Sequence, residues 1–263
     1  MKNFFVFTFI LTFSLNLYAD YSKFKVDNKK THKKTKVKLI SGKKNDKRFY
    51  QGNLTRTFDA SIDSVLSSIL NFEDKCNNKL KKKRKLTSKK KKCIYKNKNL
   101  IESKVYDPTK EYKKEKNEID RILVVRRIYN RSNFSHVDLV QIYETQNSSG
   151  QKVITIKQHM MSNKEAKKYF DPPVDHESAF GKAIAEYTLT QVDKNKTVFN
   201  YYYANETDHW LLNKSVAVDR VFDSMSSGIN LLFKSISKNI LKGNKDASTH
   251  ISRTISNNVT KNL

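Results

Sequence analysis

Between Trp210 and Leu241 an apolar residue occurs at almost every third or fourth position of the sequence. This spacing aligns the apolar side chains in one stripe and predicts a helix of about 30 residues, roughly 45 Å long. A helix of that length can lie across a whole β-sheet, so the stripe predicts a sheet packed against it. The stripe consists of Leu211, Val218, Val221, Phe222, Met225, Ile229, Leu232, Phe233, Ile236 and Ile240.

The sequence before this helix is rich in short strand-like runs separated by polar turns. Short turns between successive strands favour an antiparallel meander. One helix is expected to begin after an N-cap within Asp59-Ala60-Ser61 and to extend to about Cys76. The longer link at residues 161–182 contains Pro172 and Pro173 and predicts a lid-like loop. We expect strands at residues 49–58, 99–106, 112–118, 121–129, 137–145, 151–160, 183–192 and 197–204.

The amino terminus has the pattern of a secretory signal peptide over residues 1–19. Lys2 precedes an apolar run at residues 4–17, and the small Ala19 follows at the expected cleavage point. The run is shorter than the ~20 apolar residues that a membrane span requires, although an uncleaved anchor is the alternative. The sequence therefore predicts export to the periplasm or the medium.

Positive charge is concentrated in a few segments of the chain. The chain has 52 Lys and Arg against 26 Asp and Glu, a net charge of +26. Residues 20–48 carry a net charge of +9, residues 75–98 carry +13 and residues 242–263 carry +3. The remaining body, at residues 49–74 and 99–241, is neutral. We therefore expect a flexible basic tail at 20–48, with a short strand at residues 37–40, a folded body at 49–241 with a basic insertion at 75–98, and a polar tail at 242–263.

Dense like charge in the insertion predicts an extended loop. Two readings stay open for it: a solvated loop, or a segment that docks on an anionic membrane, where each cation contributes about 1 kcal/mol. A secreted binder of nucleic acid or another polyanion is the alternative that charge alone suggests. The residues concerned are Lys81, Lys82, Lys83, Arg84, Lys85, Lys89, Lys90, Lys91 and Lys92.

The chain has two cysteines, Cys76 and Cys93, which flank this loop. Export would permit a disulfide between them, and closing such a loop is worth about 3 kcal/mol. Two free thiols are the alternative.

The order strand, helix, basic insertion, meander and long terminal helix resembles the START (steroidogenic-acute-regulatory-related lipid transfer) domains and the wider START-like superfamily. Residues 56–65 look like the first strand leading into the first helix. Residues 132–140 look like the family's Ser-Asn-Arg-Asp segment, with Asp138 kept and Val137 in place of the arginine. Residues 200–214 look like the last strand leading into the closing helix, with a Trp-Leu-x-Asn pattern at Trp210 but without the family's usual Gly and Pro.

The resemblance covers residues 49–241 and implies an α+β helix-grip fold, in which a curved antiparallel sheet wraps around the long C-terminal helix. It further implies an apolar cavity for one lipid-like ligand, gated by the loop at 161–182. No cofactor or metal is expected. The cavity candidates are Arg127, Asp138, Tyr203, Trp210, Val218, Phe222, Met225 and Ile229.

Asp138 is expected to form an ion pair with Arg126 or Arg127, either to orient a ligand or as a purely structural pair. In the lid, aromatic and basic neighbours suit a membrane interface, although the rings could instead pack onto the body. The lid residues concerned are Lys167, Lys168, Tyr169 and Phe170.

Sequence motifs for common catalytic chemistry are absent. The chain has no Gly-x-Ser-x-Gly elbow, no His-Glu-x-x-His pair and no Gly-rich phosphate loop. START-like relatives also include cyclases and hydrolases, but no residue pair nominates a reaction here. The sequence therefore favours a ligand-binding protein over an enzyme.

Overall fold

The computed structural model describes residues 24–72, 75–76, 95–96, 100–108, 112–130, 132–169, 182–207 and 209–241. For some residues at the ends of strands only the backbone is described. The elements are β1 Lys25–Thr31, β2 Lys38–Lys44, β3 Lys47–Phe58, α2 Ile62–Leu70, β4 Lys75–Cys76, β5 Tyr95–Lys96, β6 Leu100–Tyr106, β7 Glu118–Asn130, β8 Ser132–Gln146, β9 Lys152–Met161, α4 Asn163–Ala166, β10 Ala183–Asp193, β11 Lys196–Thr207, the 3-10 turn η1 Ser215–Ala217, and α5 Val218–Leu241.

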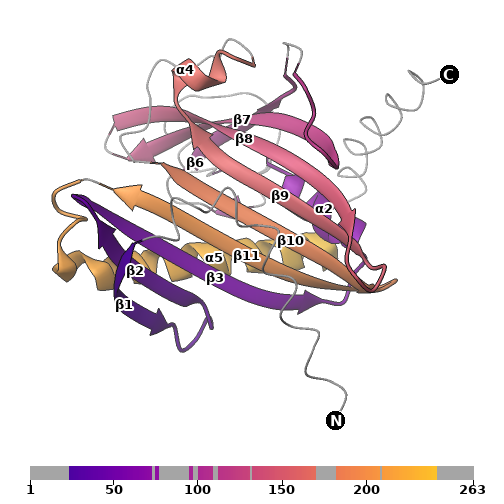
Figure 1. Cartoon of the computed structure of the whole chain (residues 1–263), viewed down its shortest axis with the longest axis horizontal. Coiled ribbons are helices and arrows are strands. Elements are labelled where there is room, and N and C mark those ends of the chain that lie inside the picture. The colour runs from indigo at the N-terminus through magenta and orange to yellow at the C-terminus, as the bar shows by residue number, and fades with distance from the viewer. Residues whose placement is uncertain are drawn as a thin grey trace.

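Nine of these strands form one antiparallel sheet in the order β1-β2-β3-β11-β10-β9-β8-β7-β6 (Figure 1). From β6 to β11 each strand pairs with its neighbour in the chain, so the predicted meander is confirmed. The last strand, β11, then pairs with β3, which places the amino-terminal strands beside the end of the meander. The described part of the chain is thus α+β, as expected.

The expectation of a flexible tail over residues 20–48 is wrong where the structure describes it, because β1 and β2 extend the sheet through this segment. Val37 and Leu39 are buried in the core, whereas the lysines between and around them face solvent. Arg48 is also buried, with Nη1 2.8 Å from Asp27 Oδ2. Lysine-rich strands at a sheet edge resemble a tail in composition because only one of their faces needs apolar residues.

Two helices cover one face of the sheet, which we call the inner face (Figure 1). The helix α2 begins at Ser61, whose Oγ accepts a hydrogen bond from Ser64 N, and it ends at Leu70. It is therefore shorter than expected, because the backbone turns after Asn71 and Phe72 packs into the core. The long helix α5 contacts α2, β2 and β3.

The helix α5 begins at Val218 rather than at the predicted Trp210. The carbonyl oxygens of Leu212 and Asn213 accept hydrogen bonds from the side chains of Tyr50 and Arg48. Because β3 holds these carbonyls, residues 209–214 form a turn instead of the first helical turns.

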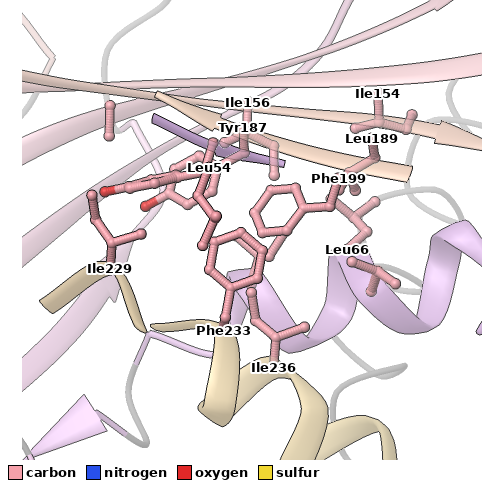
Figure 2. Packing of buried hydrophobic residues seen from close by; sticks show 14 of the residues in the cluster. Leu54, Leu66, Ile154, Ile156, Tyr187, Leu189, Phe199, Ile229, Phe233 and Ile236 are labelled. Carbon is pink, nitrogen blue, oxygen red and sulfur yellow. The ribbon is translucent and has the colours of Figure 1, made fainter. Parts of the chain in front are cut away.

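The core lies between the inner face and the two helices (Figure 2). Phe199 of β11 and Phe233 of α5 pack with their ring centroids 4.9 Å apart. Leu66 of α2 and Ile236 of α5 close the same cluster from the helix side. The apolar stripe predicted from the sequence is therefore the surface by which α5 packs on the sheet.

Gly52 of β3 marks the closest approach between the sheet and α5. A Cβ added at Gly52 would lie 2.9 Å from Ile229 Cδ1 and 3.3 Å from Met225 Cε. A larger residue at this position would therefore require the Ile229 side chain to shift.

The opposite, outer face carries a second apolar cluster over β7, β8 and β9, to which α4 contributes the buried Ala166. Residues 112–117, expected as a strand, contain a turn with Asn117 at φ +63. Glu115 in this segment accepts a hydrogen bond from Tyr143 Oη at 2.7 Å instead of pairing as a strand. No helix in the described ranges has both the length and the hydrophobicity to cross a bilayer.

Candidate functional site: a buried polar cluster on the inner face

Asp138 is a buried carboxylate on the inner face of β8. The strand register pairs Asp138 with Val124 of β7, and it pairs His136 with Arg126 on the same face. The Oδ2 atom of Asp138 lies 2.9 Å from Arg126 Nε and 3.4 Å from His136 Nε2. The expected ion pair is therefore present, and Arg126 is its cation.

Burial alone would raise the pKa of Asp138, but the Arg126 guanidinium and His136 outweigh it and hold that pKa below its usual value. The carboxylate is consequently charged at neutral pH. Phe72, just after α2, has its ring centroid 5.6 Å from Arg126 Cζ and shields the guanidinium. An ionised acceptor and a cation thus lie together in the interior.

Neutral polar groups extend the cluster across β9, β10 and β11. The Tyr187 hydroxyl donates to Gln158 Oε1 at 3.1 Å, and the rings of Tyr187 and Tyr201 lie 5.0 Å apart. Burial raises the pKa of Tyr187 to about 12 and also raises the pKa values of Tyr201 and Tyr203. These phenols therefore stay protonated and can donate hydrogen bonds.

Several buried polar atoms near this cluster have no hydrogen-bond partner within the described ranges. They include Ser103 Oγ, His136 Nδ1 and Asn205 Oδ1. Ser103 pairs with Arg126 across β6 and β7, which places it in line with His136. Buried polar groups are rarely left unsatisfied, so such atoms mark a place where water or a ligand would complete the bonding.

The apolar candidates on α5 lie against the sheet. Val218, Phe222 and Ile229 are buried, and Met225 packs against the same core. Phe222 meets Tyr50 of β3 edge to face, with centroids 6.2 Å apart. Tyr203 lies on the inner face of β11, opposite Gly52.

Two other candidates do not join this set. Trp210 is 66% exposed on the turn before α5, so its placement in a cavity is wrong. Arg127 lies in β7, where only its backbone is described, and it pairs with Ser135 rather than with the residues facing Asp138. Because strand side chains alternate between faces, the cation of the pair had to be the neighbour, Arg126.

The predicted lid is described up to Tyr169, so Phe170 lies outside the described residues. Lys167 and Lys168 are exposed. Tyr169 is half-buried against the outer face, with its ring 5.7 Å from Arg121 Cζ. The alternative that this ring packs onto the body is therefore confirmed, and its role as a membrane contact is not supported.

Arg121 was not identified from the sequence. Its guanidinium forms two hydrogen bonds to Glu118, at 2.6 and 2.7 Å, and lies 4.1 Å from the Tyr112 ring centroid. The members of the inner cluster besides Asp138, Arg126 and Tyr203 were also missed. Their only signal is the alternation of polar and apolar residues along a strand, as in His136-Val137-Asp138.

The basic segment at residues 79–92 lies outside the described residues, as do Cys93, the segment at 1–19 and the tail at 242–263. The disulfide, the signal peptide and the role of the lysines therefore stay predictions. The short strands β4 and β5 flank the segment and pair in parallel, with Cys76 opposite Lys96. No group of three or more metal-ligating side chains occurs within the described ranges.

The sequence matches no protein-family model, and no curated protein matches it. Among solved structures, similar chains include the STAR-related lipid transfer protein from Xanthomonas axonopodis, with a TM-score of 0.43 and 12% identity over 82% of this chain and 98% of that one. Human STARD10 has a TM-score of 0.44 and 13% identity over 89% of this chain and 82% of its own. The Zhui aromatase/cyclase from Streptomyces sp. R1128 has a TM-score of 0.34 and 10% identity over 71% and 93%, respectively.

These TM-scores and identities are too low to assign a ligand or an activity to this chain from the similar chains. The fold follows from the topology of this chain itself, in which a long carboxy-terminal helix lies across the inner face of one antiparallel sheet. The chain therefore has an α+β helix-grip architecture.

Proposed function

We propose that this protein binds one amphipathic, lipid-like molecule at the inner face of its sheet. The observation that carries the proposal is the buried Asp138–Arg126 pair, set beside polar atoms without partners and next to an otherwise apolar inner face. A ligand with a hydroxyl, carbonyl or other small polar group would satisfy those atoms. Its hydrocarbon part would lie toward α5, where apolar contact provides most of the binding free energy.

The polar cluster would select the ligand's orientation more than its affinity. Asp138 accepts hydrogen bonds, whereas Arg126 and the tyrosine hydroxyls donate them, so a group with both capacities fits best. A pure hydrocarbon would leave the cluster unsatisfied, which is costly for a buried site.

We further propose that the protein is exported and carries its ligand to or from an anionic membrane. The support is the signal-peptide pattern at 1–19 and the +13 charge of residues 75–98. The neutral body would hold the ligand while the basic segment brings the protein to the lipid surface.

Native mass spectrometry after mild purification tests ligand binding directly. A co-purifying molecule of lipid mass, or uptake of lipid from liposomes, is the expected result. Asp138→Asn should reduce occupancy by ligands with a polar group, and Asp219→Asn, at an exposed ion pair with Lys30, is the matched control. A protein that is empty after purification and takes up no lipid would contradict the proposal.

Deletion of residues 79–92 separates membrane carriage from binding of a polyanion. Loss of membrane association with lipid occupancy unchanged is expected. The polyanion alternative predicts that the wild type binds nucleic acid with an affinity that falls steeply as salt is added. It would be favoured if the deletion abolished that binding and the protein were never found with lipid.

A further inference from the structure

The connection between β11 and α5 exposes three large apolar side chains. Trp210 is 66% exposed, Leu211 48% and Val216 80%. Single exposed apolar residues are common on proteins, but here three lie close together in sequence, within residues 209–216. We call this segment the apolar turn.

The apolar turn is held rigidly by β3. Arg48, itself only 1% exposed, donates from Nε to the carbonyl of Asn213 at 3.0 Å. The Tyr50 hydroxyl donates to the carbonyl of Leu212 at 2.6 Å. Asn213 Nδ2 donates in turn to the carbonyl of Asp46 in the β2–β3 hairpin. The side chains are therefore presented to solvent by a fixed backbone.

A lysine of the apolar turn itself lies over its tryptophan ring. Lys214 Nζ lies 4.9 Å from the Trp210 ring centroid. In Figure 1 the turn lies beside the start of β3, so the β2–β3 hairpin is its neighbour. The charged residues in the sequence of the β2–β3 hairpin, the end of β11 and the apolar turn are Lys43, Lys44, Asp46, Lys47, Arg48, Glu206, Asp208 and Lys214, of which Lys47 and Glu206 pair at 3.0 Å.

We infer that the apolar turn docks on the surface of an anionic phospholipid bilayer. A tryptophan with neighbouring aliphatic residues suits the bilayer interface, where the ring is buried and its N–H stays near water. The adjacent lysines would meet anionic headgroups. Three projecting side chains are too few for a stable protein interface, which buries about 800 Å² on each partner.

This inference rests on the proposed function, which supplies the reason for membrane binding. The surface concerned, the apolar turn, is different from the basic segment and from the inner face. Membrane carriage was attributed to the basic segment, and the ligand to the inner face. The apolar turn would supply shallow insertion, which a lysine-rich segment alone does not provide.

The intrinsic fluorescence of the full chain tests the inference, because Trp210 is the only tryptophan. We expect its emission to shift to shorter wavelength on adding vesicles of phosphatidylcholine and phosphatidylglycerol, and to be quenched when the lipids carry brominated chains. Vesicles of phosphatidylcholine alone should produce a weaker shift, since they lack the anionic headgroups.

The variant Leu211→Ser/Val216→Ser keeps the reporter and should weaken vesicle binding by about tenfold, because two exposed aliphatic side chains no longer enter the lipid. Val192→Ser is the matched control, since Val192 is 44% exposed at the far end of β10. Circular dichroism verifies that each variant is folded. Ligand occupancy of the double variant, read by native mass spectrometry, should remain that of the wild type.

Several outcomes would overturn the inference. One is vesicle binding without a change or quenching of Trp210 emission, which would assign the contact to another segment. Another is a spectral shift with nucleic acid but not with vesicles. Equal weakening by the double variant and by Val192→Ser would also overturn it. Absence of bound lipid in the wild type would instead count against the proposed function. Failure of the inference and failure of the proposed function are therefore distinguishable.

Discussion

At the scale of single residues, strand register decides which basic residue meets Asp138. Asn130 of β7 pairs with Ser132 of β8, and in this register Asp138 pairs with Val124 and lies diagonal to Arg126. A register shifted by one residue would have aligned the other face of β7. The sequence predicts the carboxylate and two candidate arginines. The strand register that selects between these arginines cannot be derived from the sequence pattern.

Asp138→Asn is expected to destabilise the fold by about 3 kcal/mol, the lower end for breaking a buried pair, because Arg126 is left without its counterion. Urea denaturation monitored by circular dichroism measures the effect. Asp219→Asn breaks the exposed pair with Lys30 and should change stability by less than about 1 kcal/mol. If the two substitutions lowered the free energy of unfolding equally, the buried Asp138–Arg126 pair would contribute no more to stability than the exposed pair.

The same pair predicts a pH dependence. The folded-state pKa of Asp138 lies below that of an unfolded aspartate, about 3.9, so its contribution to stability is complete above that pH. The contribution is lost as the pH falls through the folded-state pKa. We therefore expect the stability difference between wild type and Asp138→Asn to narrow as the pH falls below about pH 4. Urea titrations from about pH 5 to about pH 3 measure it, and a difference that does not change over this range would contradict the assignment.

At the scale of elements, the contact of α5 with β3 depends on the missing side chain of Gly52. Gly52→Ala is expected to destabilise the fold by about 1 kcal/mol through overpacking against Ile229 Cδ1. Ile229→Val removes that methyl group, so the double variant should be less destabilised than the sum of the single variants. Thermal unfolding of the four proteins measures the coupling.

Gly228 provides the control for this cycle, because a Cβ there meets no atom within 4 Å. It lies on the exposed side of α5, so Gly228→Ala should stabilise the protein by up to about 1 kcal/mol through helix propensity. Destabilisation by both glycine substitutions would contradict a steric role specific to Gly52.

The segment after α4 is fixed to the outer face through the contact of Tyr169 with Arg121. Tyr169→Ala should release this segment and increase tryptic cleavage after Lys167 and Lys168 several-fold, with little change in global stability. Tyr112→Ala removes another ring that contacts Arg121, and Tyr112 lies in a different segment of the chain. This variant therefore serves as the control. Similar cleavage in both variants would contradict the anchoring role of Tyr169.

The elements with strong periodicity were predictable, and the exceptions have physical causes. The apolar stripe of α5 and the runs of β8 to β11 follow helix and strand periods closely. The strand β1 is almost wholly exposed, so its sequence KVDNKKT has no apolar alternation to detect. The position of Trp210 was misjudged because Arg48 and Tyr50, far away in sequence, decide where α5 begins.

At the scale of the whole molecule, the basic insertion connects two elements that the structure brings together. The strands β4 and β5 on either side of it pair, so a bond between Cys76 and Cys93 would close the insertion at its base. Reduction is expected to lower stability by about 3 kcal/mol if the loop is closed in this way. Alkylation with and without reductant, read by mass, detects the bond. Cys93→Ser should be insensitive to reductant, and labelling of both cysteines without reductant would contradict the pairing.

The strand order also determines when during synthesis the sheet can be completed. The strand β3 finds its second partner only in β11, where Phe58 pairs with Thr197 and Arg48 with Thr207. The first three strands must therefore wait until residues up to Thr207 have been synthesised before the sheet can be completed. Pairing across so long a sequence separation slows folding. A chain with this topology remains incompletely folded through most of its synthesis, the condition in which a polypeptide can be threaded through a translocation pore.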